Sequence, residues 1–543
     1  MPLSLLQTDV EVELAPSGSL AEQVCRFLRG QGGPAWVVGG YVRDRLLGRE
    51  THDLDVAVPA EAIPLARAVA DHFGGAFFPL DKERDMGRAV LREAGQPFIV
   101  DICRLRGGGL AADLALRDFT INAMAGDLSA ESMIVIDRHG GRQDLDARLV
   151  RAVGKGGFRD DPVRTLRAVR LAAELGFQLE EQTAAWIRQG APLLAASSME
   201  RVRDEMVRIV AAENAAAHLG QLDRLGLLDV VLPEVAGLQG VEQSPPHYLD
   251  VYEHSLETVQ QLEWVLEVVE GSGAAEETEG SEGAGHRTAN TGRNSQYPIP
   301  STQRVEEVLR ASLSPFTADV QTHLAQSTSA GRTRGMMLKW AALLHDLGKP
   351  KARSVESSGR VRFFEHEAIG AELAARALRR LRFTNAEVLW VETIVRRHLR
   401  PALLAREPSL TRRAIYRFFR DAGEAGVDTG LLTLADHLAT WGPKLIAERW
   451  TRRVETVALL LDAYFTRHKV TVAPQPLLSG WDLQEQFGLA QGPRIGVLLE
   501  ALREAQAVGQ VRSRDEAEAL IRRLLAEDVS GSADEADEAD EAD

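Results

Sequence analysis

The sequence predicts an α+β protein in which an α/β head is followed by a long, all-helical body. Two observations predict this division. Apolar or alternating segments typical of strands are frequent before about residue 145 and almost vanish after it. From about residue 146 onward, apolar residues recur instead at the spacing of one helix face. The 543 residues, 45% of them hydrophobic, are enough for several domains with buried cores.

The head alternates predicted strands with helices. The strands expected from apolar or alternating character are 35–38, 53–58, 88–91, 98–103 and 133–137, and residues 61–73 have helical spacing. The body is expected to form helices at 161–176, 180–189, 200–212, 250–269, 336–347, 365–382, 386–397 and 445–467. Two segments lack the apolar residues of a core and are predicted to be disordered: an insertion at 271–303 and the acidic tail at 529–543.

Amino-acid composition limits which cellular compartment and which binding partners the protein is expected to have. The two cysteines, Cys25 and Cys103, are too few for a disulfide framework. No signal peptide and no apolar stretch of about 18 residues is evident, so we expect a cytoplasmic protein without a membrane partner. The net charge of −16 disfavours a nucleic-acid partner, but eight Lys and Arg residues gather between positions 142 and 170. A phosphate backbone responds to such a local basic stripe within a Debye length.

The stretch from Val37 to Val56 contains a Gly-Gly turn followed by a strand with two acids. Gly39 and Gly40 carry no side chain, so their backbone can approach a phosphate. Asp53 and Asp55 alternate with Leu54 and therefore point to the same face of a strand. Paired carboxylates repel each other unless a cation lies between them, and their hard oxygen atoms suit Mg²⁺. The pattern predicts a site for nucleotidyl transfer.

These residues resemble the GGxVRD…DxD signature of the tRNA nucleotidyltransferase and bacterial poly(A) polymerase superfamily, from Gly39 to Val56. The resemblance implies a polymerase-β-like nucleotidyltransferase head with Asp53 and Asp55 as catalytic Mg²⁺ ligands. It also implies that Gly39, Gly40 and Arg43 bind the nucleotide. Asp101 lies in a separate strand and is the candidate third carboxylate if that strand neighbours the acid pair. The alternative is an ordinary residue at the edge of the sheet.

A second segment, 113–125, resembles the family motif RRDFTINAMA, in which Arg117, Asp118 and Asn122 contact the sugar and triphosphate. Leu116 replaces the first arginine of that motif. Only fifteen residues separate Asp101 from Arg117. Family members that add all three nucleotides of CCA generally carry a longer flexible segment there, so the short segment resembles the CC-adding subgroup.

The basic stretch 159–170 resembles the family's EDxxR motif, with Asp160 in place of glutamate. The resemblance implies that Asp161 and Arg164 read the Watson–Crick edge of the incoming base, and we assign Arg167 and Arg170 to the same nucleotide-binding surface. A carboxylate accepts from the amino group of C or A, and a guanidinium donates to the ring nitrogen or carbonyl. The alternative is a surface salt bridge between positions i and i+3.

The helical body carries a second constellation of potential metal ligands. His254, His345-Asp346 and Asp436 follow the order of the HD phosphohydrolase superfamily, which they resemble. Imidazole and carboxylate ligands suit a divalent transition metal or Mg²⁺. His366 and His398 are candidates for a second metal site; alternatively they pack, or pair with neighbouring glutamates.

We therefore expect a head at 1–147, a nucleotide-selecting and RNA-binding neck at 148–215, an HD domain at 216–470 and a helical region at 471–528, before the tail. The expected activity is template-independent addition of C and/or A to tRNA 3′ ends from CTP and ATP, with CC addition favoured over full CCA. A poly(A) polymerase, and an HD phosphohydrolase whose head only binds RNA, are the alternatives.

Overall fold

The chain forms two compact units in a computed structural model that describes residues 10–12, 18–129, 133–271, 302–329 and 331–540. Unit 1 comprises residues 1–213 and 218–231, and unit 2 comprises residues 214–217 and 232–543. The predicted head, 1–147, and residues 148–213 of the predicted neck, 148–215, thus belong to unit 1. Among the described helices, none has the length and apolar character needed to cross a bilayer.

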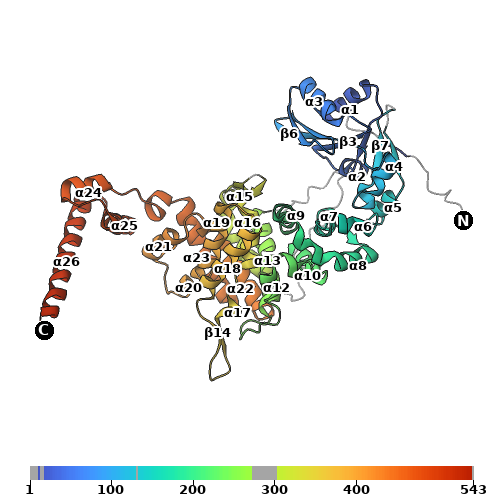
Figure 1. Ribbon diagram of the computed structural model, residues 1–543. Coiled ribbons are helices and arrows are strands. Elements are labelled where there is room, and N and C mark those ends of the chain that lie inside the picture. Colours follow the sequence, from blue (N-terminus) through green and yellow to red (C-terminus); the bar gives the residue numbers. More distant parts are fainter. Residues whose placement is uncertain (1–9, 13–17, 130–132, 272–301, 330, 541–543) are drawn as a thin grey trace, which may run out of the picture. The chain divides into compact units, whose positions relative to one another are not determined.

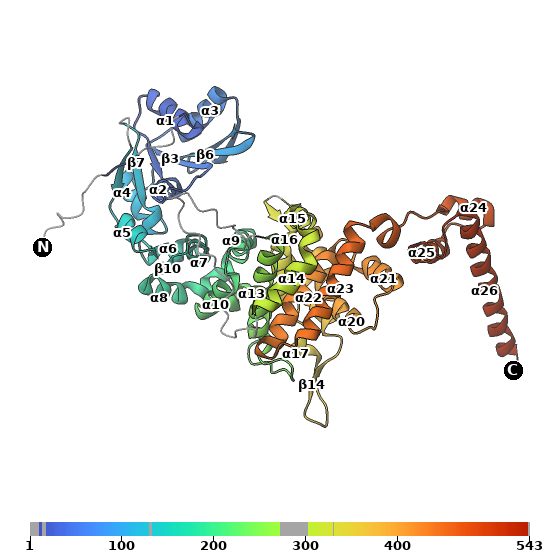
Figure 2. The same ribbon diagram turned by 180° about the vertical axis from the view of Figure 1, so that it is seen from behind.

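Unit 1 is built on an eight-stranded sheet with the strand order β1-β8-β7-β2-β3-β6-β5-β4, drawn in blue in Figures 1 and 2. Its strands are β1 (Val10–Val12), β2 (Trp36–Val38), β3 (Asp53–Val58), β4 (Ala76–Asp81), β5 (Met86–Glu93), β6 (Gln96–Arg104), β7 (Met124–Asp127) and β8 (Met133–Asp137). The central strands β3 and β6 are parallel, and the other neighbours pair antiparallel. The five predicted strands are present, and β1, β4 and β7 add to them.

Apolar residues on alternate positions of β3 and β6 fix which face of the sheet is buried. Leu54 pairs with Val100 in the parallel register, and both are buried. Helix α3 (Ala62–Phe73) packs against β4, β5 and β6. A Cβ atom added to Gly87 on β5 would lie 2.8 Å from Cβ of Ala66 on α3, so the helix approaches the sheet closely. The acids of β3 therefore point to the opposite face.

The opposite face is covered over part of its area by a short helix, α4 (Leu110–Ala115). A small core of Val38, Ala57, Leu114 and Ala125 joins this helix to strands β2, β3 and β7. The remaining helical elements of the head are α1 (Leu20–Gly30), α2 (Gly40–Leu46), η1 (Thr120–Asn122) and α5 (Gly141–Asp146).

A series of short helices follows the sheet and extends beyond the predicted neck, 148–215. They are α6 (Gly156–Asp160), α7 (Arg164–Leu175), α8 (Glu181–Gly190), η2 (Ala191–Ala196), α9 (Met199–Ala211), α10 (Ala215–Arg224) and α11 (Leu228–Val231), with a parallel pair of β9 (Leu149–Val150) and β10 (Gln178–Leu179). The expected start of a helix at residue 161 is wrong by three residues. Asp161 is extended, because the residue before Pro162 is driven out of the helical region, and α7 begins at Arg164.

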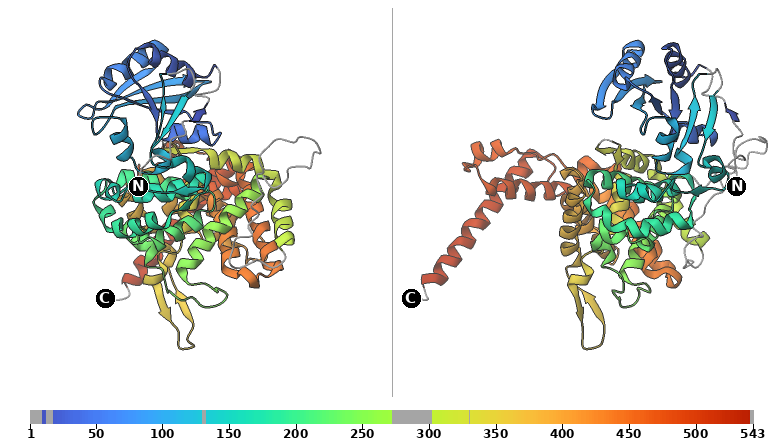
Figure 3. Two further views of the ribbon diagram at one scale, coloured as in Figure 1. Left: turned by 90° about the vertical axis from the view of Figure 1, so that its right-hand side faces the viewer. Right: turned by 45° about the vertical axis from the view of Figure 1, so that its right-hand side comes forward.

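Unit 2 is largely helical and contains the helices expected from the sequence. They are α12 (Pro233–Ala236), α13 (Val251–Glu270), α14 (Thr302–Leu313), η3 (Ser314–Phe316), α15 (Thr317–Ala325), α16 (Arg334–Leu344), α17 (Lys349–Ala352), α18 (His366–Arg380), α19 (Asn385–Arg397), α20 (Arg400–Leu404), α21 (Arg412–Ala422), α22 (Ala425–Trp441), η4 (Gly442–Lys444), α23 (Ala447–Phe465) and η5 (His468–Val472). Two small antiparallel pairs were not expected: β11 (Ser327–Ser329) with β12 (Arg332–Thr333), and β13 (Arg353–Val355) with β14 (Val361–Phe363). Figure 3 shows the second pair as a hairpin that extends from the helices of this unit.

The chain ends in α24 (Gly480–Phe487), α25 (Pro493–Ala507) and α26 (Arg514–Asp540), which share a small core that includes Leu483, Leu502 and Ile521. The expected unfolded tail is corrected here, because α26 continues to Asp540. Its Asp-Glu-Ala sequence contains glutamate and alanine, both good helix formers, and acidity alone does not prevent a helix. Of the expected insertion, residues 272–301 lie outside the described part of the chain, and Thr302 already belongs to α14.

Candidate functional site

The three acids of the head lie on neighbouring strands. Asp53 and Asp55 lie on β3, and Asp55 is opposite Asp101 of β6 in the parallel register. Asp101 was expected to be the third carboxylate only if its strand lies next to the strand of the acid pair, and β6 does lie next to β3. Asp53 is exposed and the other two are partly buried, so the acids occupy the part of the sheet face that α4 leaves open.

Asp101 has a cationic partner that the sequence did not point to. Arg88, its antiparallel neighbour on β5, donates from Nε and Nη2 to the two carboxylate oxygens of Asp101 at 2.7 and 2.8 Å. Among the described residues, the ligand oxygens of Asp53, Asp55 and Asp101 do not all lie within 4.8 Å of one another. In this arrangement Asp101 is held by Arg88 beside the acid pair.

Asp55 lies in a crowded, partly buried position beside the glycine turn. Gly39 has φ +76°, and a Cβ atom added there would lie 3.0 Å from Nη1 of Arg117 and 3.2 Å from Oδ2 of Asp55. Burial, and to a lesser extent the carboxylates of Asp101 and Asp53, raise the pKa of Asp55 to about 6, although Arg117 opposes this rise. A carboxylate held among like charges favours a cation, and hard carboxylate oxygens are the ligand type that suits Mg²⁺.

A chain of polar contacts links the glycine turn to the neck. Arg43 donates to Oδ1 of Asn122 at 2.8 Å, and Nδ2 of Asn122 donates to Oδ1 of Asp118 at 3.2 Å. Asp118 in turn accepts from Nη1 of Arg167 at 3.1 Å. Four residues expected at the nucleotide are thus brought together.

Arg117 is positioned by a buried acid that the sequence reading missed. Asp113 is 1% exposed, and its carboxylate accepts from Nε of Arg117 at 3.1 Å and from Nε of Arg106 at 2.8 Å. The spacing of four residues between Asp113 and Arg117 on a helical turn was the signal that could have identified it. The same contacts hold the short segment between β6 and Arg117 in place.

The expected base-reading pair lies at the start of α7. Nε of Arg164 is 3.9 Å from Oδ2 of Asp161, while Nη2 of Arg201, from α9, donates to that oxygen at 2.7 Å. Oδ1 of Asp161 and Nε of Arg164 are buried, and neither has a hydrogen-bond partner within the described ranges. One acceptor and one donor are therefore free for a ligand, as reading a base edge requires.

Arg170 does not join this group. It is 8% exposed, and it pairs with Glu205 at 2.5 Å and with Glu174 at 2.6 Å. Glu205 also holds Arg167 at 3.0 Å. Arg170 therefore connects α7 to α9, and its place on the nucleotide-binding surface stays a prediction.

Unit 2 gathers six histidine and aspartate residues from five places in the chain. His254 comes from α13, His345 and Asp346 follow α16, His366 begins α18, His398 follows α19, and Asp436 lies on α22. They form two groups in which the ligand atoms lie within 4.8 Å of one another: His254, His345 and Asp436, and Asp346, His366 and His398. The two carboxylate oxygens of Asp346 face different groups, since Oδ2 is 3.1 Å from Nε2 of His345 and Oδ1 is 3.4 Å from Nε2 of His366.

The histidines are arranged as metal ligands. Nδ1 of His345, His366 and His398 lies 2.7–2.8 Å from a backbone carbonyl oxygen, which leaves Nε2 directed toward the centre. The buried Nε2 atoms of His345 and His366 form no hydrogen bond with any described residue. Burial and the neighbouring imidazoles lower the pKa of His398 to about 3, so it stays neutral as a ligand must. The donor set therefore fits two divalent metal ions.

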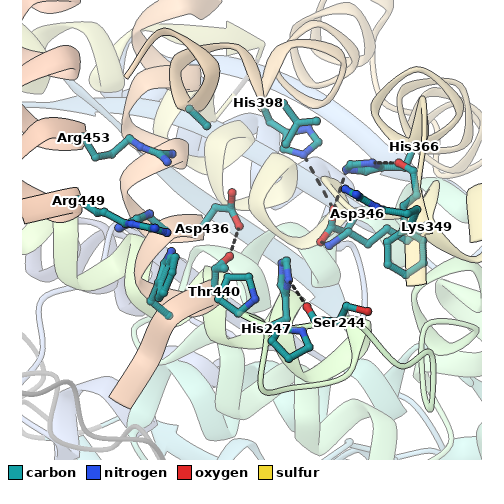
Figure 4. Close-up of a pocket in the computed structure, with 18 of the residues that line it drawn as sticks. Ser244, His247, Asp346, Lys349, His366, His398, Asp436, Thr440, Arg449 and Arg453 are labelled. Carbon is teal, nitrogen blue, oxygen red and sulfur yellow. Dashed lines mark hydrogen bonds and ion pairs between the residues drawn. The ribbon is translucent and has the colours of Figure 1, made fainter. Parts of the chain in front are cut away.

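A cavity of about 810 Å³ opens beside this centre (Figure 4). Lys349, to which the sequence analysis gave no role, adds a cation to this centre: its Nζ lies 2.6 Å from Oδ2 of Asp346. Figure 4 places Arg449 and Arg453 on one side of Asp436, and Asp346 and His366 on the other. The two carboxylates that line the cavity, Asp346 and Asp436, both belong to the metal-ligand groups.

A strand-borne acid pair beside a glycine turn, together with a separate His/Asp metal centre, defines a nucleotidyltransferase head joined to an HD domain. Residues 35–151 match the family described as "Poly A polymerase head domain", residues 176–238 "Probable RNA and SrmB- binding site of polymerase A", and residues 323–441 "HD domain". The chain is 34% identical over 507 residues to an A-adding tRNA nucleotidyltransferase of Deinococcus radiodurans, covering 92% of this chain and 97% of that one. It is 34% identical over 495 residues to a CC-adding tRNA nucleotidyltransferase of Thermus thermophilus, covering 90% and 93%. The chain belongs to the tRNA nucleotidyltransferase and poly(A) polymerase family, and it is an enzyme.

Solved structures share the fold. The CCA-adding enzyme of Bacillus stearothermophilus in complex with CTP superposes with a TM-score of 0.54 at 23% identity, over 94% of this chain and 98% of that one. The Thermotoga maritima CCA-adding enzyme complexed with tRNA gives a TM-score of 0.53 at 19% identity, over 93% and 94%.

Proposed function

We propose that this enzyme adds C and/or A to the 3′ end of tRNA from CTP and ATP, with CC addition favoured over full CCA addition. The observation that carries the activity is the acid pair beside Gly39 in a chain whose relatives of matching length are tRNA nucleotidyltransferases. In the proposal, Asp53 and Asp55 hold Mg²⁺, with Asp101 as the third carboxylate. The bound metal would lower the barrier by activating the attacking hydroxyl and stabilising charge on the leaving pyrophosphate.

The protein's own residues bind and orient the substrates. Gly39 and Gly40 allow the triphosphate to approach the backbone, and Arg43, Arg117, Asp118 and Asn122 lie around it. Asp161 and Arg164 present the acceptor and donor that would select C and A, because G and U would leave buried polar groups unpaired.

The CC preference rests on the segment between β6 and Arg117. This segment is short, contains helix α4, and is fixed through Asp113 and the buried Leu114. A segment held in this way is poorly suited to act as a flexible lever that switches the site from C to A. The relatives' names include both A-adding and CC-adding enzymes, so the assay must decide.

The test offers the purified protein tRNA ending before CCA, after one C and after CC, with Mg²⁺ and with CTP and ATP supplied separately and together. Extension that stops after CC supports the proposal. Addition of A to the CC end, with no C addition, identifies an A-adding enzyme, and full CCA addition overturns the segment argument. A long A tract identifies a poly(A) polymerase.

A second function is favoured by the two ligand groups of unit 2: hydrolysis of phosphate esters. In that reaction a water oxygen bonds to phosphorus, the ester P–O bond breaks, and the leaving alcohol oxygen takes up a proton. Bound divalent metal ions would activate the water and polarise the phosphate. Release of inorganic phosphate from nucleotides with Mg²⁺, Mn²⁺, Co²⁺ or Ni²⁺ tests it, and no release with any of them would refute it.

A further inference from the structure

The wall of the HD cavity opposite the His/Asp centre is strongly cationic. Arg449, Arg452 and Arg453 on α23 and Arg406 after α20 line the same cavity as the metal-ligand groups, and we call these four residues the arginine cluster. Positions 449, 452 and 453 are spaced to share one face of the helix. Figure 4 shows Arg449 and Arg453 on the far side of Asp436 from His366.

Within the described part of the chain, the arginine cluster forms no ion pair closer than 4.0 Å, and Asp436 acts on Arg453 from a longer distance. Within the described ranges, no carboxylate oxygen lies within 4.0 Å of a side-chain nitrogen of Arg406, Arg452 or Arg453. Nε of Arg453 is buried and has no hydrogen-bond partner there. Arg449 stacks over Trp441, with Cζ 4.8 Å from the ring centroid, so an aromatic face holds its guanidinium. A buried guanidinium donor without an acceptor, such as Nε of Arg453, costs free energy, and an anionic ligand would satisfy it.

We propose that the arginine cluster binds a second phosphate group of the substrate whose scissile phosphate lies at the His/Asp centre. The ligand class is a nucleotide phosphorylated at two positions, or an oligonucleotide whose next phosphodiester follows a terminal phosphate. This inference rests on the proposed phosphohydrolase function. Arginine is suited to the role because its planar guanidinium binds phosphate through two parallel hydrogen bonds.

A second cavity next to the first indicates where the rest of a longer substrate would lie. It has a volume of about 510 Å³, shares Arg449 and Arg452 with the first cavity, and reaches Arg304 on α14. A further phosphodiester would therefore lie near Arg304.

The experiment compares substrates with one and two phosphates on the full-length protein. Release of phosphate from adenosine 3′-monophosphate, adenosine 3′,5′-bisphosphate and a 3′-phosphorylated oligoadenylate is measured with Mn²⁺. The second phosphate is expected to raise kcat/KM about tenfold or more, as a charge-assisted hydrogen bond would. Arg453→Gln and Arg449→Gln should reduce kcat/KM for the bisphosphate at least tenfold more than for the monophosphate.

Arg362→Gln is the matched control, because Arg362 lines the same cavity but is paired with Glu356 at 2.9 Å. It should leave the preference for two phosphates in place. Arg304→Gln should lower kcat/KM for the oligonucleotide alone if a nucleic-acid strand is the source, and should leave all three substrates unaffected if a mononucleotide is the source.

Two results would overturn the proposal: equal kcat/KM for the monophosphate and the bisphosphate, or equal losses on both in the Arg453 and Arg449 variants. Calorimetric titration of the EDTA-treated protein with the bisphosphate separates this proposal from the proposed hydrolysis. Weaker binding of the bisphosphate to the Arg453 variant supports the second-phosphate site even if no substrate is hydrolysed. If the protein hydrolyses its substrates but the variant keeps both its affinity for the bisphosphate and its preference for two phosphates, the second-phosphate site is refuted and the proposed hydrolysis is not.

Discussion

Gly39 occupies a position where both the backbone and its neighbours oppose a side chain. We expect Gly39→Ala to lower the rate of nucleotide transfer roughly tenfold or more, because φ +76° is strained for alanine and the new Cβ atom would press on Arg117 and Asp55. Gly48→Ala is the control: Gly48 has φ +67° but nothing lies within 4 Å of an added Cβ atom. Both variants should lose about 1–2 kcal/mol of stability, measured by urea unfolding. Equal losses of transfer activity in the two variants would show that strain alone matters.

Asp161 carries the selection of the incoming base in our proposal. Its Oδ1 atom is buried without a hydrogen-bond partner in the described part of the chain, and Arg201 holds the other oxygen. Asp161→Ala should therefore reduce the preference for CTP over UTP about tenfold, since it removes the acceptor that pairs with the amino group of C. The measurement is the ratio of kcat/KM for the two nucleotides. Asp160→Ala is the control, because Asp160 is the exposed neighbour; a matching change in the ratio there would argue against a specific role of Asp161.

Strands and helices with a regular pattern of apolar residues could be predicted from the sequence. Strands whose composition depends on their place at the edge of the sheet could not. Strand β3 has the predicted bounds because alternation of acids and buried aliphatic residues marks both of its faces. Strand β4 lacks that signal, because it lies at the edge of the sheet, contains Pro79 and exposes Phe78 and Leu80.

The same distinction holds for the sites. The HD ligands follow from residue type and chain order, whereas Arg88 opposite Asp101, and Arg201 on Asp161, depend on strand register and helix packing across the fold. A single sequence does not reveal which strands or helices become neighbours.

One glutamate at the start of helix α19 joins the N-terminal cap of the helix to the neighbouring strands β11 and β12. Glu387 is fully buried and completes a capping box with Thr384, while it also accepts from Arg332 and Ser329 at 2.6 and 2.5 Å. Burial raises the pKa of Glu387, but the hydrogen bonds from Arg332, Ser329 and Thr384 outweigh it and hold the pKa at about 2.

The sign of the pH dependence follows from this depressed pKa. The stabilisation is fully present above the unfolded value near 4.5 and is lost as the pH falls toward 2. The free energy of unfolding should thus fall by roughly 3 kcal/mol over that window through this group. Glu387→Gln should flatten the dependence, measured by chemical denaturation at several pH values. Glu372→Gln, at an exposed position of α18, is the control and should leave it unchanged; a full pH dependence in the Glu387 variant would contradict the assignment.

At the scale of the whole molecule, the two candidate sites lie in different compact units. The acids of the head belong to unit 1 and the His/Asp centre to unit 2, so neither site takes a ligand from the other unit. Relatives such as the Deinococcus enzyme match this chain across nearly its whole length, so the match spans both units. Each of the two proposed activities is therefore assigned to residues of a single unit.

Single substitutions at each centre test that independence. Asp53→Ala should reduce nucleotide transfer about a thousandfold, because it removes a metal ligand worth several kcal/mol in the transition state, and should leave phosphate release unchanged. Asp346→Asn should do the reverse, since Asp346 faces both ligand groups of unit 2. Each variant carries its own folding control, because the activity of the untouched site reports a native chain. Asp346 is buried beside Lys349, so Asp436→Asn, on the more exposed ligand, serves as a second variant should the first one unfold. Loss of both activities in a variant that keeps its native circular dichroism would show that the two centres depend on each other, and the two-site picture would have to be abandoned.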